Sequence, residues 1–93
     1  MDPTVGEILT CLNQTKTRAT YGAVGALLHR IPRSVGRLLG PRRRAASWVV
    51  NVRTEMPSGY EKGQIHQELE GSPLIRTGKE LLELMAQGRR TLR

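Results

Sequence analysis

The feature that most constrains the fold is a pair of short helices, joined by a tight turn, between Thr20 and Leu39. Thr20 is expected to cap the first helix, because its hydroxyl can accept an orphan backbone N–H, and Pro32 suits the first turn of the second. The apolar residues recur at the spacing that lines one side of a helix: Tyr21, Val24, Leu27 and Leu28, then Ile31, Val35, Leu38 and Leu39. The spacing predicts a helix-turn-helix; the alternative is an ordinary helical hairpin with a solvated basic face.

The outer side of the second helix would be cationic and only lightly covered by side chains. If its apolar residues face inward, Arg33, Ser34, Gly36 and Arg37 face solvent. Two arginines beside a serine and a glycine form a short positive surface that another molecule can approach closely. A recognition helix that contacts DNA has this character.

Positive charge is concentrated in the same part of the chain. The 93 residues carry a formal net charge of +7, and no acidic residue lies between Glu7 and Glu55. The basic residues of that segment are Lys16, Arg18, Arg30, Arg33, Arg37, Arg42, Arg43, Arg44 and Arg53. This distribution favours a polyanionic partner, double-stranded DNA above all. An anionic membrane or an acidic protein would also fit the charge, but neither requires a helix-turn-helix.

Helices are also expected towards both ends of the chain. Asp2-Pro3 would cap and start a first helix that ends near Thr15, with its apolar face on Val5, Ile8, Leu9 and Leu12. The segment Thr77–Glu80 forms a capping box that opens a last helix. This helix is expected to close at Gln87-Gly88, and the basic tail 89–93 is expected to fray.

Between these helices the sequence predicts loops around one strand. Gly40-Pro41 ends the helix pair, and Arg42, Arg43 and Arg44 follow in an exposed loop that could reach flanking phosphates. Ser47–Val52 is rich in β-forming residues and predicts the strand; Pro57–Gly59 predicts a turn, and residues 64–69 a short helix. The chain is long enough for one domain with a modest core. We therefore expect an α/β fold, mostly α: a small winged-helix-like domain with a helix-turn-helix and a short strand or hairpin.

Little in the sequence suggests an enzyme. Cys11 is the single cysteine, which excludes an internal disulfide and favours a cytoplasmic protein, associated with the nucleoid if bacterial. It has no histidine or acid–base partner within a helical turn, so we do not interpret it as a nucleophile. His29 and His66 lack partners at metal-ligand spacing and are expected to be solvated, so no metal or cofactor is predicted. No membrane span or secretory signal is expected.

The helix pair carries a resemblance to a known family. Thr20-Tyr21-Gly22, then 33–38 (Arg-Ser-Val-Gly-Arg-Leu) and Gly40-Pro41, is similar to the DNA-binding half of the alkylguanine-DNA alkyltransferases. That family has Tyr-Gly, Arg-Ala-Val-Gly-Arg-Ala and Asn-Pro at these places. Ser58-Gly59-Tyr60 resembles its Ser-Gly-Gly base-binding loop, and Glu70-Gly71 its closing Glu-Gly. The family has an asparagine at the hinge after the recognition helix, and this chain has Gly40 there.

The resemblance does not extend to the reactive cysteine. The family's strand Pro-Cys-His-Arg-Val-Val has its counterpart in residues 46–51. Counting on from Gly40-Pro41 places Trp48 at the cysteine, whereas counting back from Val49-Val50 places Ala46 there. The first count makes the chain similar to the alkyltransferase-like proteins, in which tryptophan typically replaces the cysteine. Methyl transfer is then excluded, because no thiolate is present and the His-Arg that follow the cysteine are absent too.

The resemblance implies a binding mechanism. The recognition helix would enter the minor groove, Arg33 would take the place of a guanine nucleotide rotated out of the stack, and Tyr21 would crowd the neighbouring phosphate. The expected DNA-binding residues are Tyr21, Arg30, Arg33, Ser34, Gly36, Arg37, Arg42, Arg43 and Arg44. The expected base pocket is Trp48, Val49, Asn51, Ser58, Gly59 and Tyr60. Such a protein, expected as a monomer, would flag alkylated guanine for nucleotide excision repair proteins.

Four alternatives stay open. Tyr21 could be a core residue at the start of its helix, and Trp48 could belong to the core rather than to a pocket. Ser58 lies in a turn that would take serine anyway. The chain could also be a transcriptional regulator or architectural protein that binds DNA without a lesion pocket.

Overall fold

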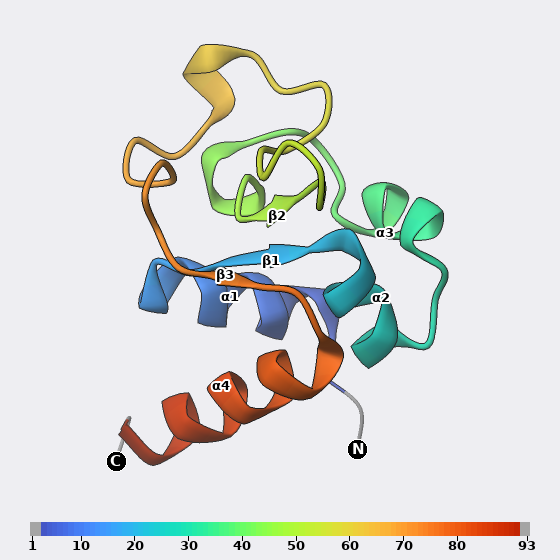
Figure 1. Ribbon diagram of the computed structural model, residues 1–93, viewed down its shortest axis with the longest axis vertical. Coiled ribbons are helices and arrows are strands. Elements are labelled where there is room, and N and C mark those ends of the chain that lie inside the picture. Colours follow the sequence, from blue (N-terminus) through green and yellow to red (C-terminus); the bar gives the residue numbers. More distant parts are fainter. Residues whose placement is uncertain (1–2, 92–93) are drawn as a thin grey trace.

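The computed structural model describes residues 3–91 as helices around a small sheet (Figure 1). The α/β class expected from the sequence is confirmed. In chain order the elements are α1 (Val5–Thr15), β1 (Arg18–Thr20), α2 (Tyr21–Leu28), α3 (Pro32–Leu38), the 3₁₀ turn η1 (Arg44–Ala46), β2 (Val49–Val50), the 3₁₀ turn η2 (Lys62–Gln64), β3 (Leu74–Ile75) and α4 (Gly78–Thr91).

The sheet is parallel, with β1 between β2 and β3. Ala19 pairs with both Val49 and Ile75, so the two outer strands meet the same short central strand. Parallel strands end at the same edge of a sheet, and this edge therefore collects the residues that follow each strand. The described strands form no hairpin, which was one of the expected forms of the β structure.

The predicted helix caps of the central pair are confirmed. The hydroxyl of Thr20 accepts a hydrogen bond from the Ala23 N–H at 3.1 Å, and Pro32 occupies the first turn of α3. The tight turn between these helices depends on Gly25, because a Cβ there would lie 2.5 Å from the carbonyl oxygen of Arg30. The Arg30 N–H donates to the Gly25 carbonyl at 2.9 Å, which closes the turn.

The predicted ends of the outer helices need correction. Thr4, not Asp2, caps α1 in a capping box with Glu7, and Asp2 lies outside the described residues. Half of the predicted Thr77–Glu80 box is present at the start of α4, where Thr77 caps the helix and the Glu80 N–H donates to Thr77 Oγ1 at 3.2 Å. The predicted stop at Gln87-Gly88 is wrong, because α4 continues to Thr91. One glycine costs a helix about 1 kcal/mol, which does not end it. Residues 92–93 of the expected frayed tail are outside the described part.

The predicted strand Ser47–Val52 is much shorter than expected. Only Val49 and Val50 pair with β1, because β1 ends at Thr20 where α2 begins. Trp48 lies in the turn that follows η1 and is fully buried. Its Nε1–H donates to Asn13 Oδ1 at 3.0 Å. Trp48 is therefore a core residue.

The segment after β2 also differs from expectation. The predicted helix over 64–69 is absent, and η2 is followed by turns that bring His66 against the core. The His66 ring lies 4.7 Å from the Trp48 ring, centroid to centroid, and its backbone N–H donates to Ser47 Oγ at 2.9 Å. His66 is thus half-buried rather than solvated.

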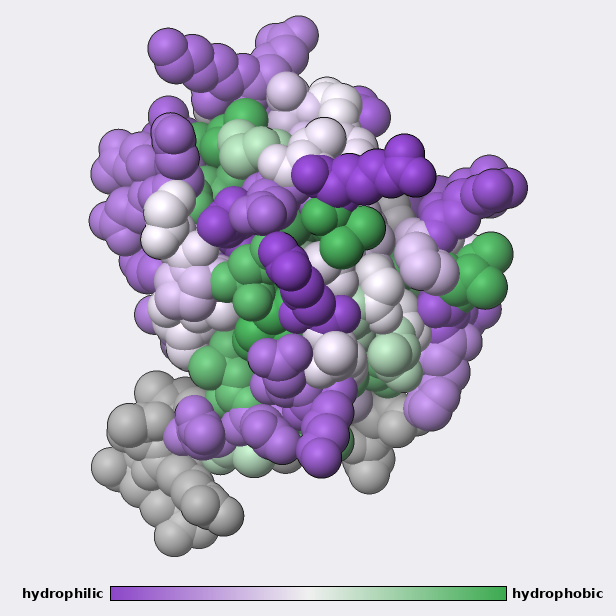
Figure 2. All heavy atoms as spheres, viewed as in Figure 1, coloured by the Kyte–Doolittle hydropathy of each residue, from purple (hydrophilic) through white to green (hydrophobic). Residues whose placement is uncertain are grey.

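The α3 helix buries less of its apolar side than the sequence suggested. Val35 and Leu39 are buried, but Ile31 and Leu38 are 65% and 41% exposed. The helix has seven residues, too short for one side to be covered along its whole length. On the face drawn in Figure 2, apolar residues reach the surface in several places between hydrophilic ones. Within the described residues, no helix has the length and apolar character needed to span a membrane.

Candidate nucleic-acid interface

An open pocket of about 870 Å³ lies at the carboxyl edge of the sheet. Residues that directly follow all three strands line it: Tyr21 after β1, Asn51 and Val52 after β2, and Arg76 after β3. The opposite wall comes from α3 and the loop behind it. The complete lining is Thr20, Tyr21, Gly22, Pro32, Arg33, Gly36, Leu39, Gly40, Pro41, Arg42, Asn51, Val52, Ser58, Tyr60 and Arg76. Ligands commonly bind at such an edge of a parallel sheet.

One side of the pocket is the Pro57–Gly59 turn, which Tyr21 and Arg42 contact from distant parts of the chain. The Ser58 N–H donates to the Tyr21 hydroxyl at 3.4 Å, so the start of α2 contacts the predicted Pro57–Gly59 turn. Gly59 has a left-handed φ of +73°, and a Cβ there would lie 2.8 Å from Nη2 of Arg42. The guanidinium of Arg42 therefore covers Gly59, which is itself not part of the lining.

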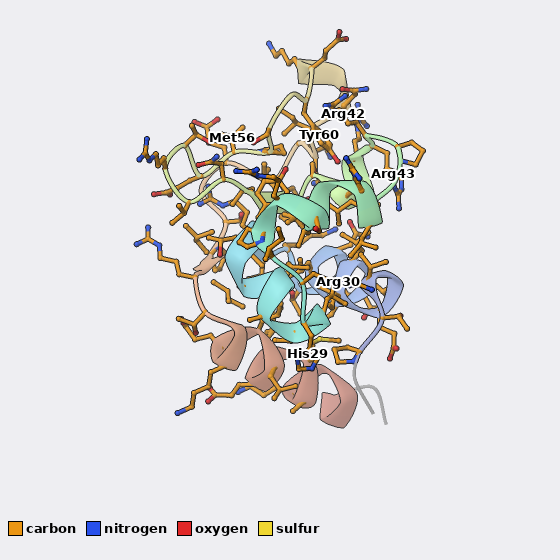
Figure 3. All side chains as sticks on the ribbon, turned by 90° about the vertical axis from the view of Figure 1, so that its right-hand side faces the viewer. His29, Arg30, Arg42, Arg43, Met56 and Tyr60 are labelled. Carbon is orange, nitrogen blue, oxygen red and sulfur yellow. The ribbon has the colours of Figure 1, made fainter. Side chains whose placement is uncertain are left out.

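Tyr60 presents a protonated phenol to this pocket. Burial raises its pKa above the ordinary value, an effect opposed by a backbone hydrogen bond from Arg43 and by the charges of Arg43 and Arg42. A protonated hydroxyl can donate a hydrogen bond to a ligand as well as accept one. Figure 3 shows Tyr60, Arg42 and Arg43 at the same end of the molecule, away from His29 and Arg30 at the turn of the helix pair.

The three consecutive arginines were expected to act alike in an exposed loop, but they have different roles. Arg42 lines the pocket. Nη1 of Arg43 donates to the carbonyl oxygens of Leu39 and Pro41, at 2.9 and 2.8 Å, and so stabilises the chain after α3. Nε of Arg44 donates to the Gly63 carbonyl at 3.3 Å, an exposed contact. All three side chains are exposed, but the guanidinium of Arg43 is engaged by the protein itself.

Glu55 organises the wall that contains Asn51 and Val52. Its carboxylate contacts Nη2 of Arg76 at 3.3 Å and Nη1 of Arg18 at 3.9 Å. Arg18 is only 8% exposed and donates to the carbonyls of Glu55 and Ser72, at 2.8 and 2.7 Å. Arg18 is thus a structural residue that joins two loops, and its charge is not available to a polyanion. Arg76 remains exposed at the pocket.

The structure brings together about half of the residues predicted from the sequence. Those that line the pocket are Tyr21, Arg33, Gly36, Arg42, Asn51, Ser58 and Tyr60. Arg30 and Arg37 are exposed outside it, and Ser34 is half-buried. Trp48 and Val49 do not line it and are fully buried, so their assignment to a base pocket is corrected.

Arg76 is the main residue that sequence reasoning missed. It follows Leu74-Ile75, a strand of two residues that is too short to show an alternating pattern. The sequence offered one sign, the apolar pair Leu74-Ile75 directly before the arginine. It indicates a pocket residue only when β3 is known to pair with β1.

The pocket lining that the structure describes contains no cysteine, histidine or carboxylate. Cys11 lies on α1, is not part of the lining, and burial raises the pKa of its thiol. Among the described residues, no three His, Cys, Asp or Glu side chains are grouped so that they could hold a metal ion. The side chains of the lining include guanidiniums, phenols, an amide and hydroxyls, which are groups that can bind and orient a ligand.

Comparisons with known proteins add no assignment. No protein-family model, curated protein or solved structure matches the chain. The grounds for a function are therefore the residues and their arrangement.

Proposed function

We propose that this chain is a non-enzymatic DNA-binding protein that recognises alkylated or otherwise modified guanine in a duplex. One observation carries the proposal: Tyr21, Arg33 and Gly36 of the helix pair line the same pocket as Ser58 and Tyr60. An element suited to DNA and a pocket suited to a base are thereby adjacent. The resemblance to the alkyltransferases rests on the same residues, and it is the reason for proposing modified guanine as the lesion.

In the proposed mechanism, α3 enters the minor groove as the recognition helix of a winged-helix-like unit. Gly36 is exposed, and a Cβ there would meet nothing within 4 Å, so the helix surface is bare where a sugar–phosphate backbone would approach. Arg33 takes the place of the nucleotide that rotates out of the stack. The extruded base enters the pocket, where Tyr21 and Tyr60 supply the aromatic surface first attributed to Trp48, and Ser58 hydrogen-bonds the base edge.

The cost of extruding the base and the free energy returned by stacking are comparable. Extrusion costs a few kcal/mol, and least for a damaged or mispaired base. Stacking on aromatic side chains returns about 1–3 kcal/mol per base. Binding without a chemical step is therefore feasible, and a protein that holds the lesion extruded could flag it for excision repair proteins.

The direct test compares one duplex that carries either guanine or O6-alkylguanine at a single position. The modified duplex should bind roughly 5- to 150-fold more tightly, if stacking supplies the preference. With a radiolabelled alkyl group, all of the label should stay on the DNA, because the thiol of Cys11 is protonated and lies outside the pocket. Equal affinity for the two duplexes would contradict lesion recognition, and label on the protein would contradict the non-enzymatic assignment.

The burial of Trp48 favours a second candidate, a DNA-binding regulator or architectural protein without a lesion pocket. The aromatic residue that the resemblance placed at the reacting position belongs to the core. A regulator would prefer particular sequences and ignore the modified base. Selection of bound duplexes from a random pool, compared with the lesion experiment, separates the two candidates.

Alanine substitutions at two glycines of the helix pair should have opposite effects. Gly36→Ala should raise the free energy of unfolding by up to about 1 kcal/mol, because glycine is a poor helix former. It should nevertheless weaken duplex binding about tenfold or more, since an added methyl group in a closely packed contact costs about 1–3 kcal/mol. Gly25→Ala should destabilise the fold instead, because its Cβ collides with the Arg30 carbonyl.

Urea unfolding and fluorescence anisotropy with a labelled duplex measure the two effects. The same substitution at Gly6 is a matched control in α1, since its Cβ would meet only Thr4 Oγ1 at an ordinary 3.8 Å and Gly6 does not line the pocket. Undiminished duplex binding by Gly36→Ala would show that α3 does not approach DNA closely.

A further inference from the structure

The pocket has an unusual charge distribution for its size. Three arginines, Arg33, Arg42 and Arg76, line it, and no carboxylate is present among the described residues that form the lining. They come from three separate parts of the chain: α3, the loop behind it, and the residue after β3. Their presence at one pocket is therefore a property of the folded domain and not of one basic run in the sequence.

Three cations at one pocket suit a phosphate monoester better than they suit DNA. A monoester carries a charge of about −1.5 to −2 at pH 7, whereas a phosphodiester in DNA carries one negative charge. Arginine is well suited to such a ligand, because its planar fork of donors can bind two phosphate oxygens at once. A duplex presents phosphodiesters along its backbone, so it does not use the full anion-binding capacity of the pocket.

The remaining lining matches a nucleobase. Tyr21 and Tyr60 offer phenol rings, and the Tyr60 hydroxyl can donate to a carbonyl oxygen. Oδ1 of Asn51 accepts from the Arg53 N–H at 2.8 Å, so the side-chain NH2 is the part of this amide that can donate to a ligand. Donors from Asn51 and Tyr60 suit a base that bears an exocyclic carbonyl, as guanine does.

We propose that the pocket binds a free nucleoside 5′-monophosphate in the absence of DNA, with Arg33, Arg42 and Arg76 on the phosphate. Arg76 is the distinguishing residue, since it lies on the sheet side of the pocket, opposite α3. Its contact with Glu55 at 3.3 Å pre-orients the guanidinium at an exposed position. The inference rests on the proposed function in that the same pocket would receive the extruded base, but binding here needs neither α3 in a groove nor base flipping.

A titration with guanosine 5′-monophosphate, followed by calorimetry and by amide chemical shifts, tests the proposal. Guanosine and inorganic phosphate, each titrated alone, should bind at least about tenfold more weakly, because each makes only part of the contacts. Arg76→Ala should weaken monophosphate binding about tenfold, as loss of a charge-assisted hydrogen bond does. Arg76→Lys should restore part of the affinity, because it keeps the charge without the fork.

Lys79→Ala is the matched control. It removes the same charge three positions along the chain, from an exposed side chain that does not line the pocket. This variant should bind the monophosphate as the parent does. An equal loss in both variants would show a general charge effect and overturn the proposal, as would guanosine binding as tightly as its monophosphate. Inorganic phosphate binding as tightly as the nucleotide would reduce the pocket to an anion site and overturn it too.

The two proposals fail in different experiments. If guanosine monophosphate does not bind while the modified duplex is still preferred, the free-nucleotide inference is wrong and lesion recognition stands. If the monophosphate binds with the expected dependence on Arg76 but both duplexes bind equally, the pocket is a nucleotide site and the proposed function is wrong.

Discussion

Replacing Trp48 with alanine is expected to lower the free energy of unfolding by about 3–5 kcal/mol, the usual range for a buried tryptophan. The side chain is fully buried, so the change leaves a cavity among β2, α1 and the turn at His66. It also leaves Asn13 Oδ1 without the indole N–H that donates to it at 3.0 Å. Against a total stability of about 5–15 kcal/mol for a domain, this loss is severe.

Urea unfolding followed by far-ultraviolet circular dichroism measures the effect. Trp48→Phe should lose less, because it keeps most of the apolar volume and removes only the N–H donor. Leu82→Ala is a useful control, since Leu82 is also a large apolar residue but is 55% exposed and should change stability little. A Trp48→Ala variant of parental stability that loses its preference for modified DNA would contradict the core assignment and restore the base-pocket interpretation.

Duplex affinity is expected to fall steeply with salt. If about five exposed cations meet phosphates, log K should fall with log[salt] with a slope of about −4 to −5. Raising the salt from about 50 to 200 mM would then weaken binding roughly 10²- to 10³-fold. Such a change results from counterions that the protein displaces from the DNA, so a nearly flat response would argue against DNA as the partner.

Two arginines allow this prediction to be assigned to particular groups. Arg37→Ala should reduce the slope by about one, because Arg37 is exposed on α3. Arg43→Ala should change the slope less and should reduce stability, because its guanidinium donates to the carbonyls of Leu39 and Pro41. Equal salt slopes for the two variants would show that the exposed Arg37 and the internally hydrogen-bonded Arg43 contribute equally to DNA binding. Titrations at several salt concentrations, each with a matched melting curve, provide both measurements.

The parts of the fold that could be predicted from the sequence are those fixed by local chemistry. The Thr20 cap, Pro32 in the first turn and the Thr77 cap are each decided within about four residues, and all three are present. The same holds for the turn at Gly59. Periodicity located only part of the buried side of α2: Val24 and Leu27 are buried, Tyr21 and Leu28 are half-buried, and the buried Ala23 and Gly25 were not predicted.

The sheet could not be predicted, because its strands exist only by pairing with one another. β2 and β3 have two residues each, and they become strands because both find β1 in parallel register. Trp48 was assigned to the base pocket by the resemblance, with a core position as the alternative, and the turn after η1 directs it into the core. Arg76 was missed because its place in the pocket depends on the pairing of β3 with β1.

The location of the aromatic residues has a practical consequence for spectroscopy. Trp48 is the single tryptophan and lies in the core, while both tyrosines, Tyr21 and Tyr60, line the pocket. The emission of Trp48 should therefore be blue-shifted and shielded from iodide in the native state. Both properties should be lost when the core unfolds. Tyrosine emission should instead respond to whatever occupies the pocket. The unmodified protein thus carries two optical reporters, one in the core and one at the pocket, and comparing their emission distinguishes a ligand that binds from one that unfolds the domain.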